Sequence, residues 1–272
     1  MNNLILLIPH YNDPKGLLSA LSSIGCNEKL DVIIVDDGSE NDLLDEAVVL
    51  NSFTAHGRVF FAYLTPNMGI EHALNKGLDF ILSHKQYKYI ARLDCADKCL
   101  GERFKIQQDF LEAHPDIMLV SSNMICVDTE GNFLNNRVFP LDSDDIKKRM
   151  YVNNMFSHVA SMFTVEAVRE IGTYPLNYKA AEDYAFFFKF VKKYKTANLN
   201  QFLVLCEINP RGISYLKRNQ QVQNRIRIIF DNFYFGFWPL YGLIRNCIIY
   251  ILPFSIIQKI KRWSYEAQYK KQ

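Results

Sequence analysis

The sequence predicts an α/β fold in which helices flank an open, mainly parallel sheet, with a basic and apolar helical extension at the C-terminus. Over the first 125 residues, short continuous apolar runs alternate with segments of helical apolar spacing, as strands covered on both faces require. A net charge of only +2 and 14% aromatic residues exclude intrinsic disorder. The five predicted strands are Leu4–Ile8, Val32–Val35, Val59–Leu64, Tyr89–Leu93 and Ile117–Val120.

Helices are predicted in the connections between these strands, in right-handed crossovers. Asp13 is expected to cap the first helix, with Pro14 in its first turn and Gly25 at its end, since these residue types favour those positions. The next three predicted helices are Asp42–Leu50, Gly69–Leu82 and Glu102–Ala113.

The middle of the chain is less regular. Asp128–Gly131 is typical of a turn between two strands, and Ser143 is expected to cap a short helix that extends to Met150. Glu182–Lys193 is a predicted helix whose phenylalanines form a buried stripe. The predicted stripe is Phe186, Phe187 and Phe190, and the last predicted strand is Phe202–Cys206.

Composition divides the chain into a domain of residues 1–215 and an extension of residues 216–272. Residues 1–210 carry 20 Lys and Arg against 27 Asp and Glu, whereas residues 211–272 carry 11 against 2. A basic extension on an acidic body predicts an anionic partner for the extension, either nucleic acid or a membrane surface.

The extension is apolar as well as basic. Its runs Phe233–Ile244 and Cys247–Ile257 are each shorter than the roughly 20 residues that span a bilayer. Joining them would bury Arg245 at a cost of about 2.5 kcal/mol or more. A helix lying on anionic lipid is therefore predicted; the alternatives are a helix packed against the domain and a dimer contact. The residues expected to flank the lipid-facing helix are Arg225, Arg227, Trp238, Lys259, Lys261, Arg262 and Trp263.

Several classes of protein are made unlikely by the absence of their characteristic sequence motifs. The six cysteines lack CxxC spacing, which argues against zinc ribbons and disulfide scaffolds and favours a reducing compartment. The N-terminus lacks the basic region and cleavage site of a signal peptide, so we expect a cytoplasmic protein. GxGxxG after the first strand, a P-loop, GxSxG and HExxH are all absent from the sequence.

Polar residues follow three predicted strands at the point where each strand ends, in Pro9–Asn12, Asp36–Ser39 and Arg92–Asp97. Ligands of open α/β sheets bind outside the carboxyl ends of the strands, so we expect the three clusters to meet at one edge. Carboxylates there suit hydroxyls, ring N–H groups and a divalent metal. The alternative is that these residues only cap helices and turns.

The order of these motifs resembles that of family 2 glycosyltransferases with the GT-A fold, over residues 4–215. The most specific segment is the VDDGS of Val35–Ser39. The other matching segments are Leu7–Asn12, Asn67–Gly69, Ala73–Gly77, Arg92–Asp94, Glu102–Phe104, His158, Ser161–Phe163, Ile171–Tyr174 and Glu182–Tyr184.

The resemblance implies an inverting glycosyltransferase that moves a sugar from a nucleotide-diphosphate donor, expected to be UDP-linked, to a glycan or lipid-linked glycan. The setting that it implies is bacterial surface polysaccharide synthesis, as of lipopolysaccharide or capsule, on the inner face of the cytoplasmic membrane. By position, Pro9, Tyr11 and Asp37 would hold the pyrimidine base, with Asp37 accepting the imide N–H. Asp94 would lie beside the donor ribose and the metal.

On the acceptor side, the resemblance implies that Asp183 is the general base that takes the proton from the attacking hydroxyl. A carboxylate within about 3 Å of that hydroxyl can do this. Glu182 and His158 would line the acceptor. The alternative for His158 is an interior histidine held by hydrogen bonds.

The metal site departs from the family's usual D-x-D-D, because Ala96 replaces one carboxylate in Asp94-Cys95-Ala96-Asp97. A Mn²⁺ or Mg²⁺ ion would then use Asp94 and Asp97, with Asn209 at the position of a further ligand. Without a metal ion, Arg92 and Lys76 would neutralise more of the charge on the donor's diphosphate.

Two alternative functions come from other classes. Ala96 and Asn209 weaken the metal site, which favours a relative that binds nucleotide-sugar or glycan without turnover; the presence of Asp37, Asp94 and Asp183 argues against it. A nucleic-acid-binding protein would use the basic extension. We do not expect nucleic acid as a partner, because the extension is apolar and lacks a recognisable binding module.

Overall fold

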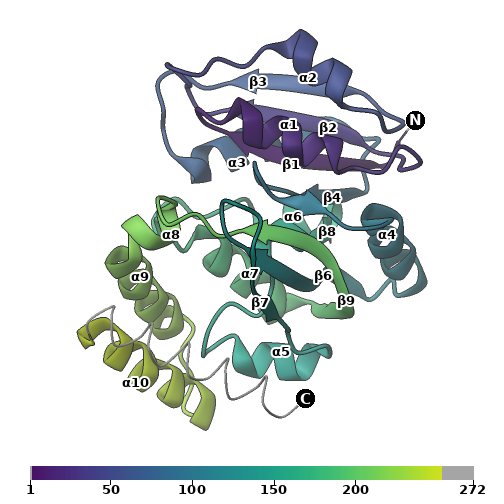
Figure 1. Cartoon of the computed structure of the whole chain (residues 1–272). Coiled ribbons are helices and arrows are strands. Elements are labelled where there is room, and N and C mark those ends of the chain that lie inside the picture. Colours follow the sequence, from purple (N-terminus) through teal and green to yellow (C-terminus); the bar gives the residue numbers. More distant parts are fainter. Residues whose placement is uncertain (1, 253–272) are drawn as a thin grey trace.

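The structure, a computed structural model, describes residues 2–252 apart from the side chains of residues 213 and 214. Its first four strands are β1 (Leu4–His10), β2 (Asp31–Asp36), β3 (Val59–Tyr63) and β4 (Tyr89–Arg92). They are parallel, with β2 between β3 and β1 and with β4 on the other side of β1. Helices cover both faces of the sheet (Figure 1), so the predicted α/β fold is confirmed.

The connecting helices are α1 (Pro14–Ser22), α2 (Glu46–Ser52), α3 (Ile70–Ser83) and α4 (Arg103–Ala113). Asp13 caps α1 as predicted, since its carboxylate accepts the Gly16 N–H at 2.9 Å. Helix α2 begins later than predicted, because Asp45 rather than Asp42 accepts the free N–H groups of its first turn.

The other strands are β5 (Lys98–Cys99), β6 (Ile117–Val127), β7 (Phe133–Arg137), β8 (Met162–Thr164) and β9 (Lys195–Glu207). The sheet order is β3-β2-β1-β4-β8-β6-β9-β5, with β7 paired to β6. This second part is mixed, because β8 runs antiparallel to β4 and β6 whereas β9 runs parallel to β6. Strand β6 is longer than predicted because its polar residues have buried partners, as where the Ser121 hydroxyl donates to the Ser157 carbonyl at 3.1 Å.

The core follows the alternation of side chains along β1. Leu4, Leu6 and Ile8 pack with α1 and α4, whereas Ile5 and Leu7 face α3 and α7 (Glu182–Lys193). The remaining helices of this part are α5 (Ser143–Arg149), the 3₁₀ turn η1 (His158–Ala160) and α6 (Val165–Ile171). The predicted phenylalanine stripe of α7 is fully buried, and the cap of α5 is Asp142 rather than Ser143.

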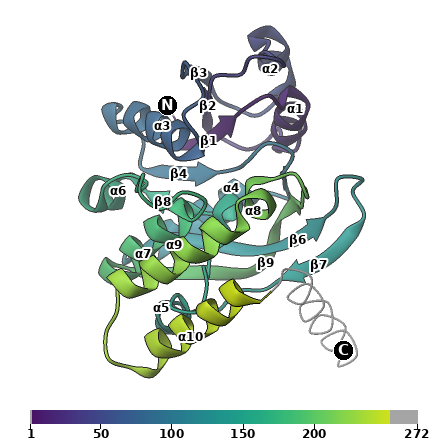
Figure 2. The ribbon, with the colours of Figure 1, turned by 90° about the vertical axis from the view of Figure 1, so that its left-hand side faces the viewer.

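The extension folds back on the domain. It contains α8 (Ile213–Leu216), α9 (Arg218–Asp231) and α10 (Phe237–Ile251), of which α9 and α10 lie side by side (Figure 2). Ile228 and Ile229 of α9 join the core beneath α7. Gly242 of α10 approaches the backbone so closely that a Cβ would lie 1.9 Å from the Tyr151 carbonyl oxygen. The arrangement is therefore the packed helix that we kept as an alternative.

The opposite face of α10 remains uncovered by the described residues. Its exposed apolar side chains are Phe237, Leu240, Tyr241, Ile244, Ile248 and Ile251. None of the helices in residues 2–252 is both long and apolar enough to cross a membrane. The predicted flanking residues Lys259, Lys261, Arg262 and Trp263 lie outside the described residues.

Candidate active site

The carboxyl ends of β1, β2 and β4 meet at one edge of the sheet, as predicted. His10 is level with Asp36 across the β1–β2 pair, and Leu7 is level with Arg92 across the β1–β4 pair. The loops after these strands also contact one another. The Asn12 N–H donates to the Ser39 hydroxyl at 2.8 Å, so the first two clusters form one surface.

Asp36 is a fixed, ionised acceptor within this edge. The His10 ring nitrogen Nδ1 lies 2.6 Å from Asp36 Oδ2, and the Ser39 N–H donates to Oδ1 at 2.8 Å. Burial raises the pKa of Asp36, but the hydrogen bonds from Ser39 and His10 outweigh it and hold the pKa below its usual value.

Asp37 fixes the loop that precedes α3. Its Oδ1 accepts the Met68 N–H and its Oδ2 the Gly69 N–H, each at 2.9 Å, and the Asn67 amide donates to Oδ2 at 3.1 Å. The approach is close enough to require glycine beside it: Gly38 has φ +71°, and a Cβ there would lie 2.5 Å from Asn67 N. Burial raises the pKa of Asp37, which these backbone N–H groups oppose. Oδ1 keeps one lone pair for a further donor.

The other residues of the predicted base pocket differ in accessibility. The Tyr11 side chain is exposed and Pro9 is half-buried at the end of β1. Lys76 is exposed on α3, and no hydrogen bond or ion pair in the described residues joins it to the carboxylates. The structure therefore brings Pro9, Tyr11 and Asp37 to one edge but does not tie Lys76 to it.

Arg92 is completely buried beneath the edge and holds three groups together. Its guanidinium donates to Asp94 Oδ1 at 2.6 Å, to the Leu7 carbonyl and to Nε2 of His158, the last at 3.3 Å. The Asp94 side chain keeps 31% of its surface exposed. Arg92 thus has no surface to offer a ligand, and it acts on the site by orienting Asp94.

His158 is enclosed by hydrogen-bonding side chains. Because Arg92 only donates, the His158 nitrogen Nε2 must be the acceptor, and the ring proton is assigned to Nδ1. The Tyr174 hydroxyl lies 2.9 Å from the same nitrogen. Loss of hydration and then the charge of Arg92 lower the pKa of His158 well below its usual value, so the ring is neutral. This placement matches the interior histidine kept as an alternative.

Asp97 is buried and is held by strand β9. Its Oδ1 accepts the Glu207 N–H at 2.8 Å, and burial, followed by the charge of Asp94, raises its pKa well above the usual value. Asn209 accepts the Arg211 N–H within its own exposed turn. Within residues 2–252, no group of three or more His, Cys, Asp and Glu side chains is arranged to hold a metal ion. Of the two carboxylates in Arg92–Asp97, only Asp94 is therefore exposed enough to coordinate a metal ion that arrives with a bound ligand.

Glu182 and Asp183 open α7 on the other side of this edge. The Asn154 amide donates to Asp183 Oδ2 at 2.9 Å, whereas the Glu182 oxygen Oε2 has no hydrogen-bond partner among the described residues. Burial and then the charge of Asp183 raise the pKa of Glu182 to about 8. Burial also raises the pKa of Asp183, against the Tyr184 N–H and the charge of Arg225. The charge of Asp94 contributes to raising both pKa values, so Glu182 and Asp183 lie within electrostatic range of the strand-end carboxylates.

The comparisons with known proteins agree with this geometry. Residues 5–172 match the family model described as glycosyl transferase family 2. The chain belongs to this family, and it is a glycosyltransferase. The amylovoran biosynthesis glycosyltransferase AmsE of Erwinia amylovora is 29% identical over 265 residues, which cover 93% of this chain and 96% of AmsE.

Two solved structures show the same fold. TarS 1–349 of S. aureus in complex with UDP has a TM-score of 0.60 at 16% identity, over 85% of this chain and 66% of that one. The mannosyltransferase PcManGT of Pyrobaculum calidifontis, in complex with GDP-Man and Mn²⁺, has a TM-score of 0.61 at 17% identity, over 90% and 68%. In a further TarS crystal structure, this chain spans only 41% of the longer protein.

Sequence reasoning missed three neighbours of the predicted residues in this family 2 glycosyltransferase. Asn154 donates to Asp183, Tyr174 contacts His158, and Arg225 of α9 lies near Asp183. Arg225, Arg227 and Trp238 were expected to flank a lipid-facing helix; for Arg225 that expectation is wrong, whereas for the exposed Arg227 and the half-buried Trp238 it stays a prediction. Arg225 donates to Gln221 and faces Asp183, Arg227 lies over the Tyr178 ring, and Trp238 packs against the core. A basic, apolar composition does not show which helix face turns inward.

Proposed function

We propose that the protein is an inverting glycosyltransferase that moves a sugar from a UDP-linked donor to a hydroxyl of a glycan or lipid-linked glycan during surface polysaccharide synthesis. The observation that carries the proposal is the gathering of carboxylates in two groups: Asp37 and Asp94 at the ends of β2 and β4, and Asp183 at the start of α7, within range of the Asp94 charge. We call the first group, with Asp36, the donor side and the second, with Glu182, Asn154 and Arg225, the acceptor side. AmsE, named for amylovoran biosynthesis, and TarS, solved with UDP, support the choice of polymer and nucleotide.

On the donor side, Pro9 and the exposed Tyr11 would contact the base, while the remaining lone pair of Asp37 would accept the imide N–H. Asp94, oriented by Arg92, would accept from the ribose hydroxyls. Because hydrogen bonds already fix both carboxylates, the entropic cost of ordering these side chains on donor binding is small.

On the acceptor side, the two carboxyl groups would differ in protonation state, with Asp183 ionised and Glu182 protonated. Asp183 accepts from Asn154 and lies near the Arg225 charge, both of which stabilise its ionised form. Glu182 lacks such partners, and its pKa of about 8 leaves it protonated at neutral pH. Asp183 is therefore the general base, with a pKa raised toward the working pH, which makes it a better proton acceptor. Glu182 would donate a hydrogen bond to the acceptor.

A divalent metal fits this site only in a minimal form. Asp97 is buried and bonded to Glu207, and position 96 has no carboxylate, so Asp94 would be the single protein ligand. Mg²⁺ in nucleotide sites is often held by one or two carboxylates together with substrate phosphates and waters. When bound, such an ion would neutralise charge on the leaving diphosphate. The same minimal donor set favours, as a second candidate, a protein that binds nucleotide-sugar without turnover.

A donor screen by thermal shift, followed by a transfer assay, tests the proposal. We expect UDP or a UDP-sugar to raise the melting temperature more than GDP-, dTDP- or CMP-sugars do, since a ligand that binds the native state stabilises it by mass action. Release of UDP that depends on an added acceptor glycan would support transfer. Tight UDP binding with no release in any acceptor extract would favour the second candidate, and binding of no nucleotide would reject both.

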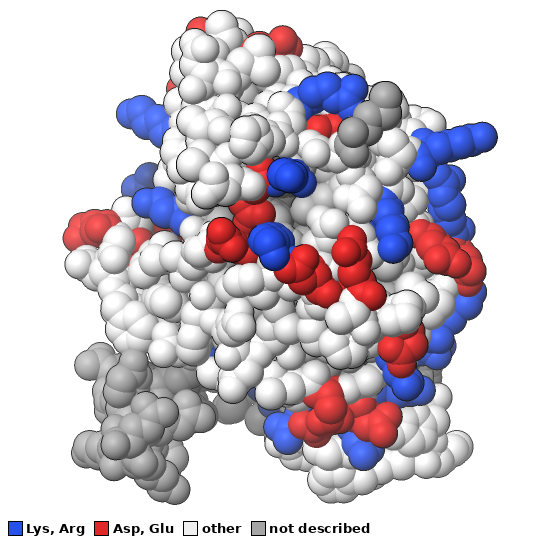
Figure 3. All heavy atoms as spheres, turned by 90° about the vertical axis from the view of Figure 1, so that its right-hand side faces the viewer, with Lys and Arg blue, Asp and Glu red and all other residues white. Residues whose placement is uncertain are grey.

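We also propose that the enzyme works on the cytoplasmic membrane face, docked through the exposed row of α10. Six exposed large apolar side chains on one helix face are typical of a helix that lies on a membrane surface. The face seen in Figure 3 is a different one, away from α9 and α10; its acidic and basic side chains lie interspersed, which does not favour nucleic acid binding on that face. Ile244→Glu with Ile248→Glu should abolish sedimentation with anionic vesicles, whereas Val48→Glu on α2 should not; equal sedimentation of both variants would count against docking.

A further inference from the structure

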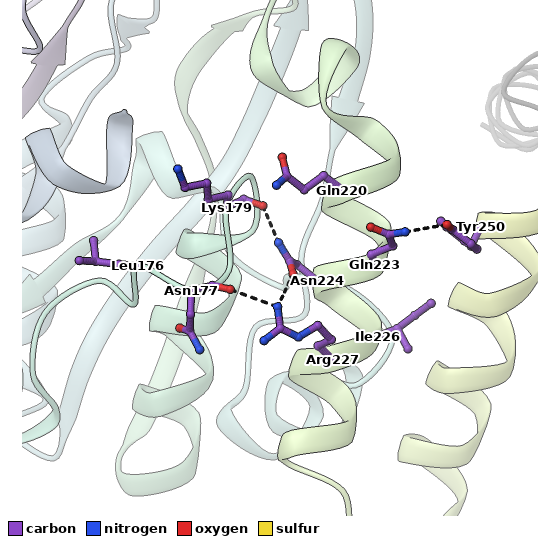
Figure 4. A pocket seen from close by; sticks show the side chains of 9 residues that line it. All are labelled: Leu176, Asn177, Lys179, Gln220, Gln223, Asn224, Ile226, Arg227 and Tyr250. Atoms are coloured by element: carbon purple, nitrogen blue, oxygen red, sulfur yellow. Dashed lines mark hydrogen bonds between the residues drawn. The ribbon is translucent and has the colours of Figure 1, made fainter. Parts of the chain in front are cut away.

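A groove of about 670 Å³ lies between the loop that precedes α7 and helix α9 (Figure 4). This size is typical of sites for small ligands. None of the donor-side or acceptor-side residues named above lines it. The lining residues are Leu176, Asn177, Lys179, Gln220, Gln223, Asn224, Ile226, Arg227 and Tyr250.

The chemistry of the groove is that of side-chain amides, of which four line it. An amide offers both donors and an acceptor, as a sugar hydroxyl does, so the two groups can pair in either direction. The Gln220 amide has no hydrogen-bond partner among the described residues and extends beside the groove (Figure 4). Gln223 donates through Nε2 to the Tyr250 hydroxyl at 2.6 Å, which leaves the Gln223 carbonyl and the Tyr250 proton for a ligand.

The walls of the groove are held in place before any ligand binds. Asn224 donates to the Lys179 carbonyl at 2.8 Å, and Arg227 donates to the Asn177 carbonyl at 3.3 Å. The Arg227 guanidinium also makes a cation–π contact with Tyr178, at 5.3 Å from the centre of the ring. A preformed wall lowers the ordering cost of binding, as a specific site requires.

Both walls lead from the groove to the acceptor side. On α9, positions 220, 223, 224 and 227 recur at helical spacing along the groove, and Arg225 follows on the adjoining face toward Asp183. On the other wall, Lys179 precedes Glu182 by three residues, and its Nζ lies 3.8 Å from Glu71. The charge of Glu71 contributes to the raised pKa of Glu182, so this end of the groove adjoins the acceptor carboxyl groups.

We propose that this groove is a subsite for the acceptor glycan, in which the amides bind the sugar residue next to the one that is attacked. The inference rests on the proposed function, because it assigns an oligosaccharide acceptor to the same site. It makes α9 a shared element: one face of the helix holds the acceptor chain, and the next places Arg225 beside the base.

Saturation-transfer NMR on the full-length protein with UDP present tests the subsite. The probes are maltotriose, cellotriose, mannotriose and triacetylchitotriose, and the proteins are wild type, Gln220→Ala with Gln223→Ala, and the control Gln201→Ala. Gln201 is an exposed glutamine of β9 outside the groove. We expect at least one trisaccharide to bind wild type and control alike, and to bind the double variant roughly 10-fold more weakly, as the loss of two neutral hydrogen bonds implies.

The other outcomes separate this inference from the proposed function. Equal binding by the double variant, or no binding of any trisaccharide to the wild type, would overturn the subsite. A chemical-shift response to inorganic phosphate that the double variant keeps, with no trisaccharide bound by any of the three proteins, would also overturn it, in favour of an anion site at Lys179 and Arg227. Loss of UDP binding in all three proteins would instead reject the proposed function, which the UDP thermal shift reports separately.

Discussion

Asp36 on the donor side accepts hydrogen bonds from two neighbours at its own strand ends, whereas Glu182 on the acceptor side is buried with one carboxyl oxygen unpartnered. Their pKa values move in opposite directions as a result. The hydrogen bonds of Asp36 lower its pKa despite burial, while burial raises that of Glu182 to about 8. Asp36 is thus held as a fixed charge at the donor edge, whereas Glu182 on the acceptor side exchanges its proton near neutral pH.

The origin of the partners differs in the same way. Each donor-side carboxylate is held by residues of the first half of the chain, such as Ser39, Gly69 and Arg92. Asp183 depends on Asn154 and on Arg225 of the extension, which are brought together only by the packing of α9. Substitutions on the two sides should therefore change different measured quantities.

The largest effect is expected for Asp183→Asn. The amide cannot take a proton, so kcat should fall by about 100- to 10,000-fold. Donor affinity should stay within twofold, because Asp183 is not on the donor side. Single-turnover transfer and UDP calorimetry measure the two quantities, with Asp109→Asn on exposed α4 as the control. Turnover at the wild-type rate would remove Asp183 from the mechanism.

Asp37→Ala should act on binding instead. Loss of a hydrogen bond to a charged acceptor should weaken the affinity for UDP by roughly 1.5–3 kcal/mol. The Met68 and Gly69 N–H groups would also lose their acceptor, so the loop before α3 should exchange amide hydrogens faster. Calorimetry with Asp42→Ala as an exposed control checks the affinity. An unchanged affinity would place the base elsewhere.

The difference between partners close in sequence and partners distant in sequence also explains what could be predicted from the sequence. Continuous apolar runs and the Asp36–Ser39 motif are local signals, so the parallel strands and their convergent ends were predictable. The role of Arg92 in orienting Asp94 was not predictable, because the sequence motif does not reveal that this charged side chain is fully buried. Asp97 illustrates the same point: its partner is the Glu207 N–H on β9, far along the chain.

The acceptor side was predictable only as a motif. Glu182 and Asp183 stand out in the sequence, but their pKa values depend on burial and on Arg225, which is distant in sequence. Composition also led to the interpretation of α9 and α10 as a lipid-facing unit. Close packing at Gly242 shows instead that one face of α10 is turned inward and the other outward.

Arg225→Gln should shift the pH dependence of transfer. The positive charge favours the ionised form of Asp183, so its removal raises the pKa of this carboxyl further. Since the base acts when ionised, the acidic limb of kcat/KM should move to higher pH, by up to roughly one unit. Activity at pH 6 should fall about 3- to 10-fold and recover at higher pH. Arg225→Lys should keep the wild-type profile, and a uniform loss at every pH would indicate a structural role only.

The smallest effect is expected at Ala96, and it concerns the metal. With Asp94 as the single available ligand, the protein without donor should bind Mn²⁺ negligibly, and donor affinity should rise when Mn²⁺ is added. Ala96 has φ +69°, a conformation that Asp and Asn adopt more readily than most residues, so Ala96→Asp should fold with no more backbone strain than the wild type.

Ala96→Asp should tighten Mn²⁺ binding a few-fold, because it adds a second carboxylate beside Asp94. Ala96→Asn, which has the same shape without the charge, is the matched control and should give a smaller gain. Isothermal calorimetry of Mn²⁺ with and without UDP measures both. Full activity of the wild type in excess EDTA, with no effect of Mn²⁺ on donor affinity, would contradict a metal role. Basic groups such as Lys76 would then stabilise the negative charge on the leaving diphosphate. Under those conditions, Lys76→Ala should lower kcat.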